Sequence, residues 1–215
     1  TAALAAKMGR TRGLRHQHLE TAPVELAVDV DGLARSLGCD ARAWQPADLP
    51  AVLDYLPEGQ PLALYGRGPN WLYAAVAIHA WPAPFHLFDV RLGWVESPAL
   101  TFGELPADAP LQARVTQSMH GQAITFRLVD AYLDLAGARD LRVPPVAGKG
   151  GVILNGKLPH WLWCALARAY RGAWHPREMS WLALFQPQVQ SAVVVASRIA
   201  DPAVGTCVPF APEPG

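Results

Sequence analysis

Two short turns in this chain combine the residue types that bind an anion. Each has a glycine, a cation, one further residue and a proline, and the two turns lie 90 residues apart: Gly66-Arg67-Gly68-Pro69 and Gly156-Lys157-Leu158-Pro159. Glycine permits a tight turn, and proline suits the first turn of a helix, where its missing N–H would otherwise be unpaired. Because the remaining backbone amides and the cation can face an anion, we expect Arg67 and Lys157 to contact a negatively charged ligand.

A second set of polar residues differs between the two copies. Asp89 and Arg91 follow a Leu-Phe pair in the first copy, whereas Gln186 and Gln188 follow the matching pair in the second. The second copy instead carries His175 in a Trp-His-Pro run. An acid, a cation and a histidine supply the groups that proton transfer and charge stabilisation need. The decay of one redundant copy would leave the same pattern, so both interpretations stay open.

The elements around the turns are predicted by short apolar runs and by apolar stretches of helical length. A helix that crosses between two parallel strands forms a βαβ unit, and its ligand site lies beyond the carboxyl ends of the strands. Both turns and Asp89 fall at such ends. The predicted elements are strands at 61–65, 85–88, 151–155 and 181–185, and helices at 69–80 and 159–170.

The repeat predicts an α/β protein with two tandem Rossmann-like units, each a β-hairpin plus a βαβ core. Residues 14–96 form the first unit and residues 111–199 the second, and the proline-rich stretch 97–110 is the expected linker. The expected hairpins pair 15–20 with 24–30 and 111–117 with 123–128, and a helix is expected near 129–136. As a packing motif, the repeat also predicts that Trp71 and Trp161 are core anchors.

The composition limits the classes of partner. Hydrophobic residues make up 51% and charged residues 17% of 215, which favours a homodimer or a higher oligomer that covers part of the surface. The 18 basic and 18 acidic side chains balance, which argues against a coat on long nucleic acid. Three cysteines without paired spacing give no disulfide framework or zinc site. Neither a signal peptide nor a membrane-spanning run is evident, so we expect a cytoplasmic protein without membrane contact.

The motifs together resemble the small CRISPR-associated ring nucleases of type III systems, specifically the third family. The strand followed by a Gly-Arg-Gly-Pro-x-Trp-Leu-Tyr turn and helix occurs at 62–73 and again, modified, at 152–163. A loop of the Tyr-Asp-Pro-Arg-Leu-Gly type occurs at 88–93, with Val90 in place of the proline. The closing Gly-Ala-Val-Val-Val strand is matched at 191–195.

This resemblance implies a CRISPR-associated Rossmann fold that acts as a two-fold unit on cyclic tetra-adenylate, the second messenger of type III immunity. It maps the catalytic residues of the family onto Asp89, Arg91 and His175. Manganese is the cofactor that the resemblance suggests, but any such site would depend on the histidine, and no metal ligands are assigned from the sequence. The ligand-binding residues that we expect are Gly66, Arg67, Gly68, Asn155, Gly156, Lys157, His160, Gln186 and Gln188.

The implied reaction needs no protein nucleophile, because the ribose 2′-hydroxyl can attack the neighbouring phosphate once it is held in line with the leaving oxygen. Asp89 or His175 would transfer protons and Arg91 would neutralise charge. The alternatives are a non-catalytic module that senses or sequesters the messenger and a structural protein without a nucleotide ligand. Two units in one chain favour an intramolecular cleft over a site shared between chains.

Overall fold

The computed structural model describes residues 13–130, 133–147, 150–172 and 179–212. It is a mixed α/β fold, as the sequence predicts, with two main sheets and a short two-stranded one. The first half contains a short helix at 13–20, followed by β1 (Ala27–Asp29), α2 (Val30–Leu37), η1 (Pro46–Asp48), α3 (Leu49–Tyr55), β2 (Leu62–Tyr65), α4 (Asn70–His79), β3 (Phe85–Asp89), β4 (Gly93–Glu96) and β5 (Thr101–Phe102).

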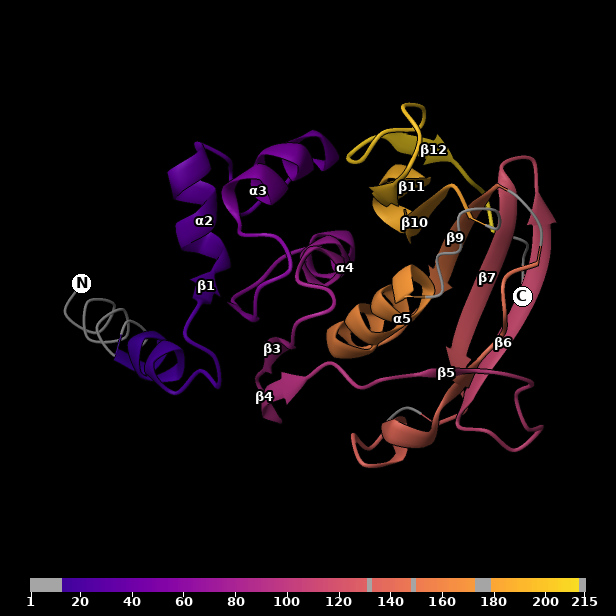
Figure 1. The fold of residues 1–215 in the computed structure, drawn as a ribbon, viewed down its shortest axis with the longest axis horizontal. Coiled ribbons are helices and arrows are strands. Elements are labelled where there is room, and N and C mark those ends of the chain that lie inside the picture. The colour runs from indigo at the N-terminus through magenta and orange to yellow at the C-terminus, as the bar shows by residue number, and fades with distance from the viewer. Residues whose placement is uncertain (1–12, 131–132, 148–149, 173–178, 213–215) are drawn as a thin grey trace.

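The second half begins with a long hairpin, β6 (Leu111–Ser118) and β7 (Gly121–Leu128), which confirms the hairpin expected there. Its other elements are η2 (Gly137–Asp140), β8 (Arg142–Val143), β9 (Gly151–Gly156), α5 (His160–Gly172), β10 (Trp181–Gln186), η3 (Pro187–Val189), β11 (Ser191–Ser197) and β12 (Cys207–Pro209). The helices α4 and α5 pack against each other between the two main sheets (Figure 1).

The strand register is the same in both halves. The first sheet has the order β1-β2-β3-β4, and the second has the order β12-β11-β10-β9-β7-β6. Leu62 lies opposite Phe85 in the parallel pair β2–β3, and Val152 lies opposite Leu182 in the parallel pair β9–β10. In both sheets the next strand, β4 or β11, is antiparallel. The offset that relates the two turns therefore also relates the strands that carry them.

The hairpin expected at 15–30 is wrong, because residues 13–20 are helical and β1 pairs in parallel with β2. The alternation of apolar residues up to Val30 suggested a longer strand. However, the Asp29 side chain accepts a hydrogen bond from the Gly32 amide at 2.7 Å and so starts α2 at Val30. Helix capping thus shortens the strand to three residues.

One other expectation in the middle of the chain needs correction. The helix expected near 129–136 is absent from the described residues of that stretch, and a 3-10 turn, η2, follows it instead. The predicted linker 97–110 is partly ordered as β5, whose Thr101 and Phe102 pair with Arg142 and Val143 of β8. The linker is therefore anchored to the second half.

One hydrophobic core runs through both halves. Every residue from Trp71 to Ile78 is buried, because α4 packs against α3, α5 and the strands β10 and β11. Trp71 and Trp161 are each 2% exposed, which confirms their prediction as core residues. A smaller apolar cluster, which includes Ala123 and Val194, lies on the opposite face of the six-stranded sheet. Within the described residues no helix has the length and apolar character that a membrane span requires.

Candidate functional site

The two turns have the same backbone requirement. Gly66 has φ of 117° and Gly156 has φ of 145°, a region that side chains with a Cβ rarely adopt. A Cβ at Gly156 would overlap the carbonyl oxygen of Phe126, and one at Gly66 would lie 3.3 Å from the Cβ of Val30. The neighbouring element, β7 for Gly156 and the start of α2 for Gly66, therefore approaches each turn closely, and the backbone conformation at both positions favours glycine.

A tyrosine fixes the first turn and has no equivalent in the second. The Tyr73 hydroxyl accepts a hydrogen bond from the Gly68 amide at 2.5 Å and donates one to the Gly66 carbonyl at 2.8 Å. Burial raises the pKa of Tyr73, so this hydroxyl keeps the proton that it donates. The counterpart of Tyr73 is Trp163, whose buried Nε1 has no hydrogen-bond partner within the described residues.

This difference changes which amides an anion could reach. The expectation that both turns offer free amides holds better for the second turn, because the Gly68 amide is already bonded to Tyr73. Leu158, the counterpart of Gly68, has an amide without a partner in the part of the chain that is described. Arg67 and Lys157 are both exposed. At the position where the first turn has an amide bonded to Tyr73, the second turn thus has an amide without a described partner, beside the exposed Lys157.

The two helix starts meet directly. Asn70 and His160 are the first residues of α4 and α5, and His160 Nδ1 lies 2.6 Å from Asn70 Oδ1. The imidazole also packs against the ring of Tyr73, with 4.8 Å between ring centroids. A residue that touches its own counterpart is expected near a two-fold axis. The two turns consequently lie on either side of one junction, which we call the helix junction.

His160 is placed to transfer a proton. A hydrogen bond to the amide oxygen of Asn70 requires a proton on Nδ1, so Nε2 of the neutral ring carries the lone pair. The ring keeps an exposed edge, yet its packing lowers the pKa of His160, and the nearby charge of Asp89 acts in the opposite direction. The charge of Asp89 in the first half therefore acts on His160 in the second half.

Asp89 lies at the carboxyl end of β3, where the sequence predicts it. One of its carboxylate oxygens stabilises the backbone of the following turn. Its Oδ1 accepts hydrogen bonds from the amides of Arg91 at 2.8 Å and Leu92 at 3.2 Å, which closes the turn between β3 and β4. Its other carboxylate oxygen makes no hydrogen bond to a described residue. The side chain of Arg91 is exposed. Asp89 thus keeps one carboxylate oxygen with which it could meet a ligand.

The remaining expected residues lie at different places. Gln186 ends β10 at the position that Asp89 has in β3, and Gln188 is exposed in η3. Asn155 Nδ2 donates to Thr125 Oγ1 at 3.3 Å, which directs it to the outer face of the six-stranded sheet and not to α5. His175 lies outside the described residues. Of the residues expected to bind the ligand, His160 is part of the helix junction, and Arg67 and Lys157 each precede a junction residue by three positions.

The described residues do not fit a metal site. They contain no group of three histidine, cysteine, aspartate or glutamate side chains that could hold an ion. We therefore derive no step through manganese. Two pockets, of about 700 and 1030 Å³, are lined by other residues: the first lies on the β6–β7 hairpin, and the second lies between Trp81, Pro98 and Arg168.

Sequence reasoning missed two residues of the helix junction. Asn70 was not singled out, although its offset from His160 equals that of the two turns. Tyr73 was read only as part of a motif, and its bonds to Gly66 and Gly68 depend on how the helix folds back over the turn. The first copy has Tyr73 where the second copy has Trp163. This sequence difference could have indicated that the two turns are stabilised differently.

The comparisons with known proteins point to one class. Residues 127–209 match a family model described as CRISPR-associated protein (Cas_csx3). This segment contains Lys157, His160, Gln186 and Gln188, whereas Asp89 and Arg91 precede it. No curated protein was found to match the chain. The match associates the second half with CRISPR-associated proteins.

Proposed function

We propose that this protein binds cyclic tetra-adenylate across the helix junction and cleaves it, which would switch off type III CRISPR signalling. The observation that carries the proposal is the contact between Asn70 and His160, because it brings two related turns together within one chain. A cyclic tetranucleotide is itself two-fold symmetric, so two related Rossmann-like halves can meet it with matching surfaces. The match of residues 127–209 to a CRISPR-associated family supports the same proposal.

The turns and cations would bind the phosphates. The open amide of Leu158 and the side chain of Lys157 lie on one side of the junction, and Arg67 and Arg91 belong to the other half. Backbone amides at a helix start favour a phosphate group, and a guanidinium adds two parallel donors. In this proposal cyclic tetra-adenylate is bound asymmetrically, and its phosphates make the tighter contact with the second turn.

The chemistry would be an in-line transfer within the RNA. The 2′-oxygen forms a bond to phosphorus as the bond from phosphorus to the 5′-oxygen breaks, leaving a 2′,3′-cyclic phosphate and a 5′-hydroxyl. Nε2 of His160 or the open oxygen of Asp89 would take the proton of the 2′-hydroxyl, and the other group, once protonated, would supply one to the 5′-oxygen. Arg91 would stabilise the added charge on the phosphorane.

The test is incubation with labelled cyclic tetra-adenylate, with and without manganese. We expect a linear product that ends in a 2′,3′-cyclic phosphate. Asp89→Ala and His160→Asn should each lower the rate by about 100-fold or more, the usual effect of removing one such group. The exposed Asp54→Ala variant is the control and should keep the rate. If the wild-type chain neither binds nor cleaves the ring, the proposal is wrong.

A second candidate function is sequestration of the messenger without cleavage. The observation in its favour is that Asp89 Oδ1 is occupied by two backbone amides, while the second half has the uncharged Gln186 and Gln188. This function predicts tight binding without product under both metal conditions. Multiple turnover that is lost in Asp89→Ala would exclude it.

A further inference from the structure

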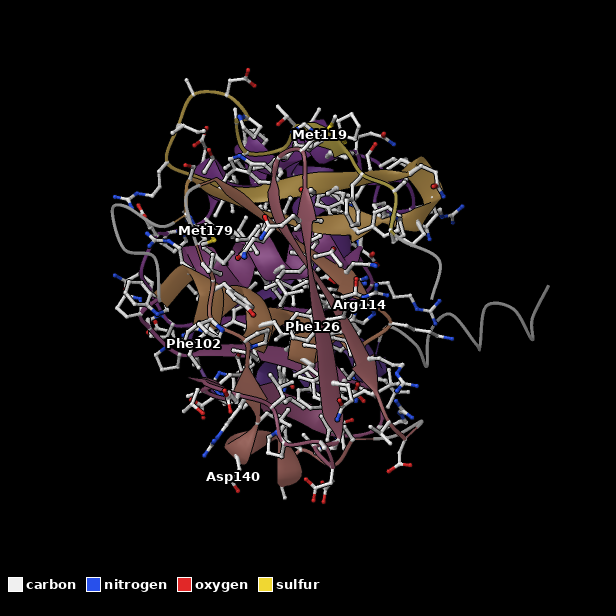
Figure 2. All side chains as sticks on the ribbon, turned by 90° about the vertical axis from the view of Figure 1, so that its right-hand side faces the viewer. Phe102, Arg114, Met119, Phe126, Asp140 and Met179 are labelled. Atoms are coloured by element: carbon white, nitrogen blue, oxygen red, sulfur yellow. The ribbon has the colours of Figure 1, made fainter. Side chains whose placement is uncertain are left out.

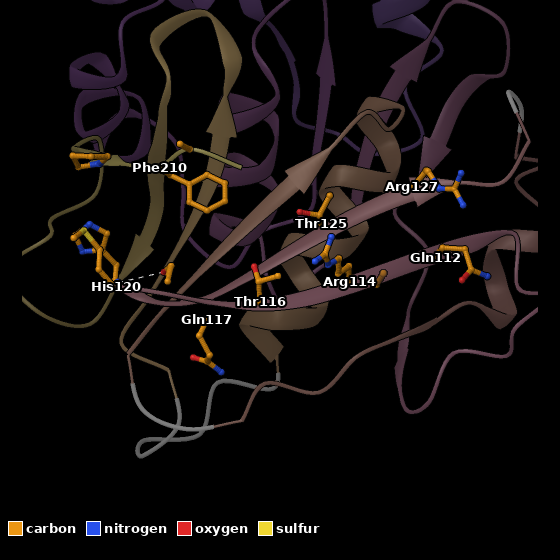
Figure 3. A pocket seen from close by; sticks show the side chains of 13 residues that line it. Gln112, Arg114, Thr116, Gln117, His120, Thr125, Arg127 and Phe210 are labelled. Carbon is orange, nitrogen blue, oxygen red and sulfur yellow. Dashed lines mark hydrogen bonds between the residues drawn. The ribbon is translucent and has the colours of Figure 1, made fainter. Parts of the chain in front are cut away.

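The outer face of the β6–β7 hairpin carries a second polar pocket. In this antiparallel pair Arg114 lies opposite Thr125, and Gln112 lies opposite Arg127, so these four side chains share one face. They belong to a pocket of about 700 Å³, which also includes His120 and Phe210 (Figure 3). Figure 2 shows this face of the hairpin, with Met119 at its tip and Arg114 further along. We call it the hairpin pocket.

The hairpin pocket is positive although the chain as a whole is neutral. Among the described residues, its lining includes Arg114 and Arg127 and contains no aspartate or glutamate. The strand register makes the two arginines diagonal neighbours, with backbones about 7–8 Å apart. Both side chains are exposed. Two guanidiniums at this spacing can bind the oxygens of one phosphate group from two sides.

The same pocket offers an aromatic surface and free polar atoms. Phe210 packs edge to face with Phe185, with 5.4 Å between ring centroids, which fixes the orientation of its ring. The Nε2 atom of His120 is buried and has no hydrogen-bond partner among the described residues. The hydroxyl of Thr125 accepts from Asn155 and still has its own proton to donate. An aromatic face beside hydrogen-bonding groups is suited to a nucleobase.

The corresponding face of the first half is closed. There Tyr65, the counterpart of Asn155, packs with His18, Phe88 and Trp94. His18 comes from the helix at 13–20, and its backbone carbonyl accepts a hydrogen bond from Trp94 Nε1 at 3.0 Å. The second half keeps an aromatic residue, Phe185, at the position of Phe88, but it has Asn155 in place of Tyr65. Its outer face is therefore polar at Asn155 and Thr125, where the first half has the covered Tyr65 cluster.

We propose that the hairpin pocket binds a nucleoside monophosphate unit, with the phosphate between Arg114 and Arg127 and the base against Phe210. The pocket lies on the face of the sheet opposite α5, so it is separate from the helix junction. The unit can come as a free nucleotide or as the end of a short single-stranded RNA, because both present the same phosphate and base. The proposal does not depend on the cleavage of cyclic tetra-adenylate.

The test is isothermal titration of the full chain with AMP, linear tetra-adenylate, adenosine and inorganic phosphate. We expect AMP to bind at least tenfold more tightly than adenosine or phosphate, because it uses both parts of the pocket. Comparison of AMP with the linear RNA identifies which source of the unit fits better. Equal affinity for AMP and inorganic phosphate would overturn the assignment to a nucleotide.

Matched variants separate the two sites. Arg114→Ala and Arg127→Ala should each weaken AMP binding about tenfold or more and leave the melting temperature unchanged, since both side chains are exposed. Phe210→Ala should bring the affinity for AMP down to that for phosphate. The exposed Arg42→Ala, which lies in neither site, is the control and should leave AMP binding unchanged. Unchanged affinity for AMP in both arginine variants would overturn the proposal.

Discussion

His160 Nδ1 and Asn70 Oδ1 are 2.6 Å apart, and these two residues occupy the same position in the two copies of the turn. The contact joins the starts of α4 and α5, so the Gly66 and Gly156 turns flank it. Nothing outside the chain is needed to bring them together. The expectation of an intramolecular cleft stays a prediction, and this contact is the structural observation that favours it.

The first prediction is that cleavage of cyclic tetra-adenylate, per chain, does not depend on protein concentration. Asp89 and His160 come from different halves of one chain, so dilution does not separate them. Activity should stay constant over a thousandfold dilution, measured by product formation. Mixing Asp89→Ala chains with His160→Asn chains should restore nothing. Restored activity in the mixture would instead mean that the site forms between chains.

The second prediction concerns Tyr73→Phe, which removes the hydroxyl that bonds Gly66 and Gly68. The loss should lower the free energy of unfolding by about 1–3 kcal/mol, the effect of leaving buried polar groups unpaired. It should also weaken the binding of cyclic tetra-adenylate, because the first turn loses its fixed shape.

Tyr170→Phe is the matched control for this variant. Tyr170 is also buried, and its hydroxyl donates to the Pro144 carbonyl at 2.8 Å and makes no hydrogen bond to either turn within the described residues. Loss of the Tyr170 hydroxyl should lower the free energy of unfolding by a similar amount, measured by chemical denaturation. The affinity for cyclic tetra-adenylate should stay at the wild-type value. Equal affinities in both variants would show that Tyr73 does not shape the site.

The third prediction is that Gly156→Ala destabilises the fold. The alanine would have to adopt φ near 145° and its Cβ would overlap the carbonyl oxygen of Phe126. Backbone strain of this kind typically costs about 1–3 kcal/mol. Thermal denaturation should show the loss, whereas Gly137→Ala, where a Cβ meets nothing within 4 Å, should change little. A stable Gly156→Ala variant would contradict the close approach of β7.

The fourth prediction concerns pH. Packing lowers the pKa of His160 below its ordinary value of 6.5, so the unfolded chain takes up this proton at a higher pH than the folded chain. The stability that the neutral ring contributes is therefore complete above pH 6.5 and decreases as the pH falls toward the folded pKa. An NMR titration of the imidazole measures this pKa directly, and His160→Asn should remove this part of the pH dependence of the melting temperature.

Asp89 supplies a check on the same prediction. Its negative charge raises the pKa of His160, against the effect of packing. Asp89→Asn should therefore lower this pKa further, and the exposed Asp54→Asn should leave it unchanged. A pKa that is the same in all three proteins would show that Asp89 and His160 do not interact.

Patterns that depend on neighbouring residues could be predicted from the sequence. The Gly-cation-x-Pro turns, the strands beside them and the buried Trp71 and Trp161 follow from local spacing and apolar periodicity. The prediction of the first hairpin is wrong because the alternating apolar pattern suggested a long strand. The hydrogen bond from the Gly32 amide to the Asp29 side chain instead starts a helix at Val30. The pairing of Asn70 with His160 depends on how α4 packs on α5, and no local pattern encodes that geometry.

An Asn–His pair at a two-fold axis is unavailable to a symmetric homodimer, where a residue on the axis can face only another copy of itself. Joining the two halves in one chain removes this restriction. Each side of the contact can then change by a separate mutation, so that one residue keeps an amide and the other acquires a titratable ring. The exchange of Tyr73 for Trp163, and of Asp89 for Gln186, shows the same freedom. Two halves within one chain thus meet through surfaces that can differ in chemistry and change independently.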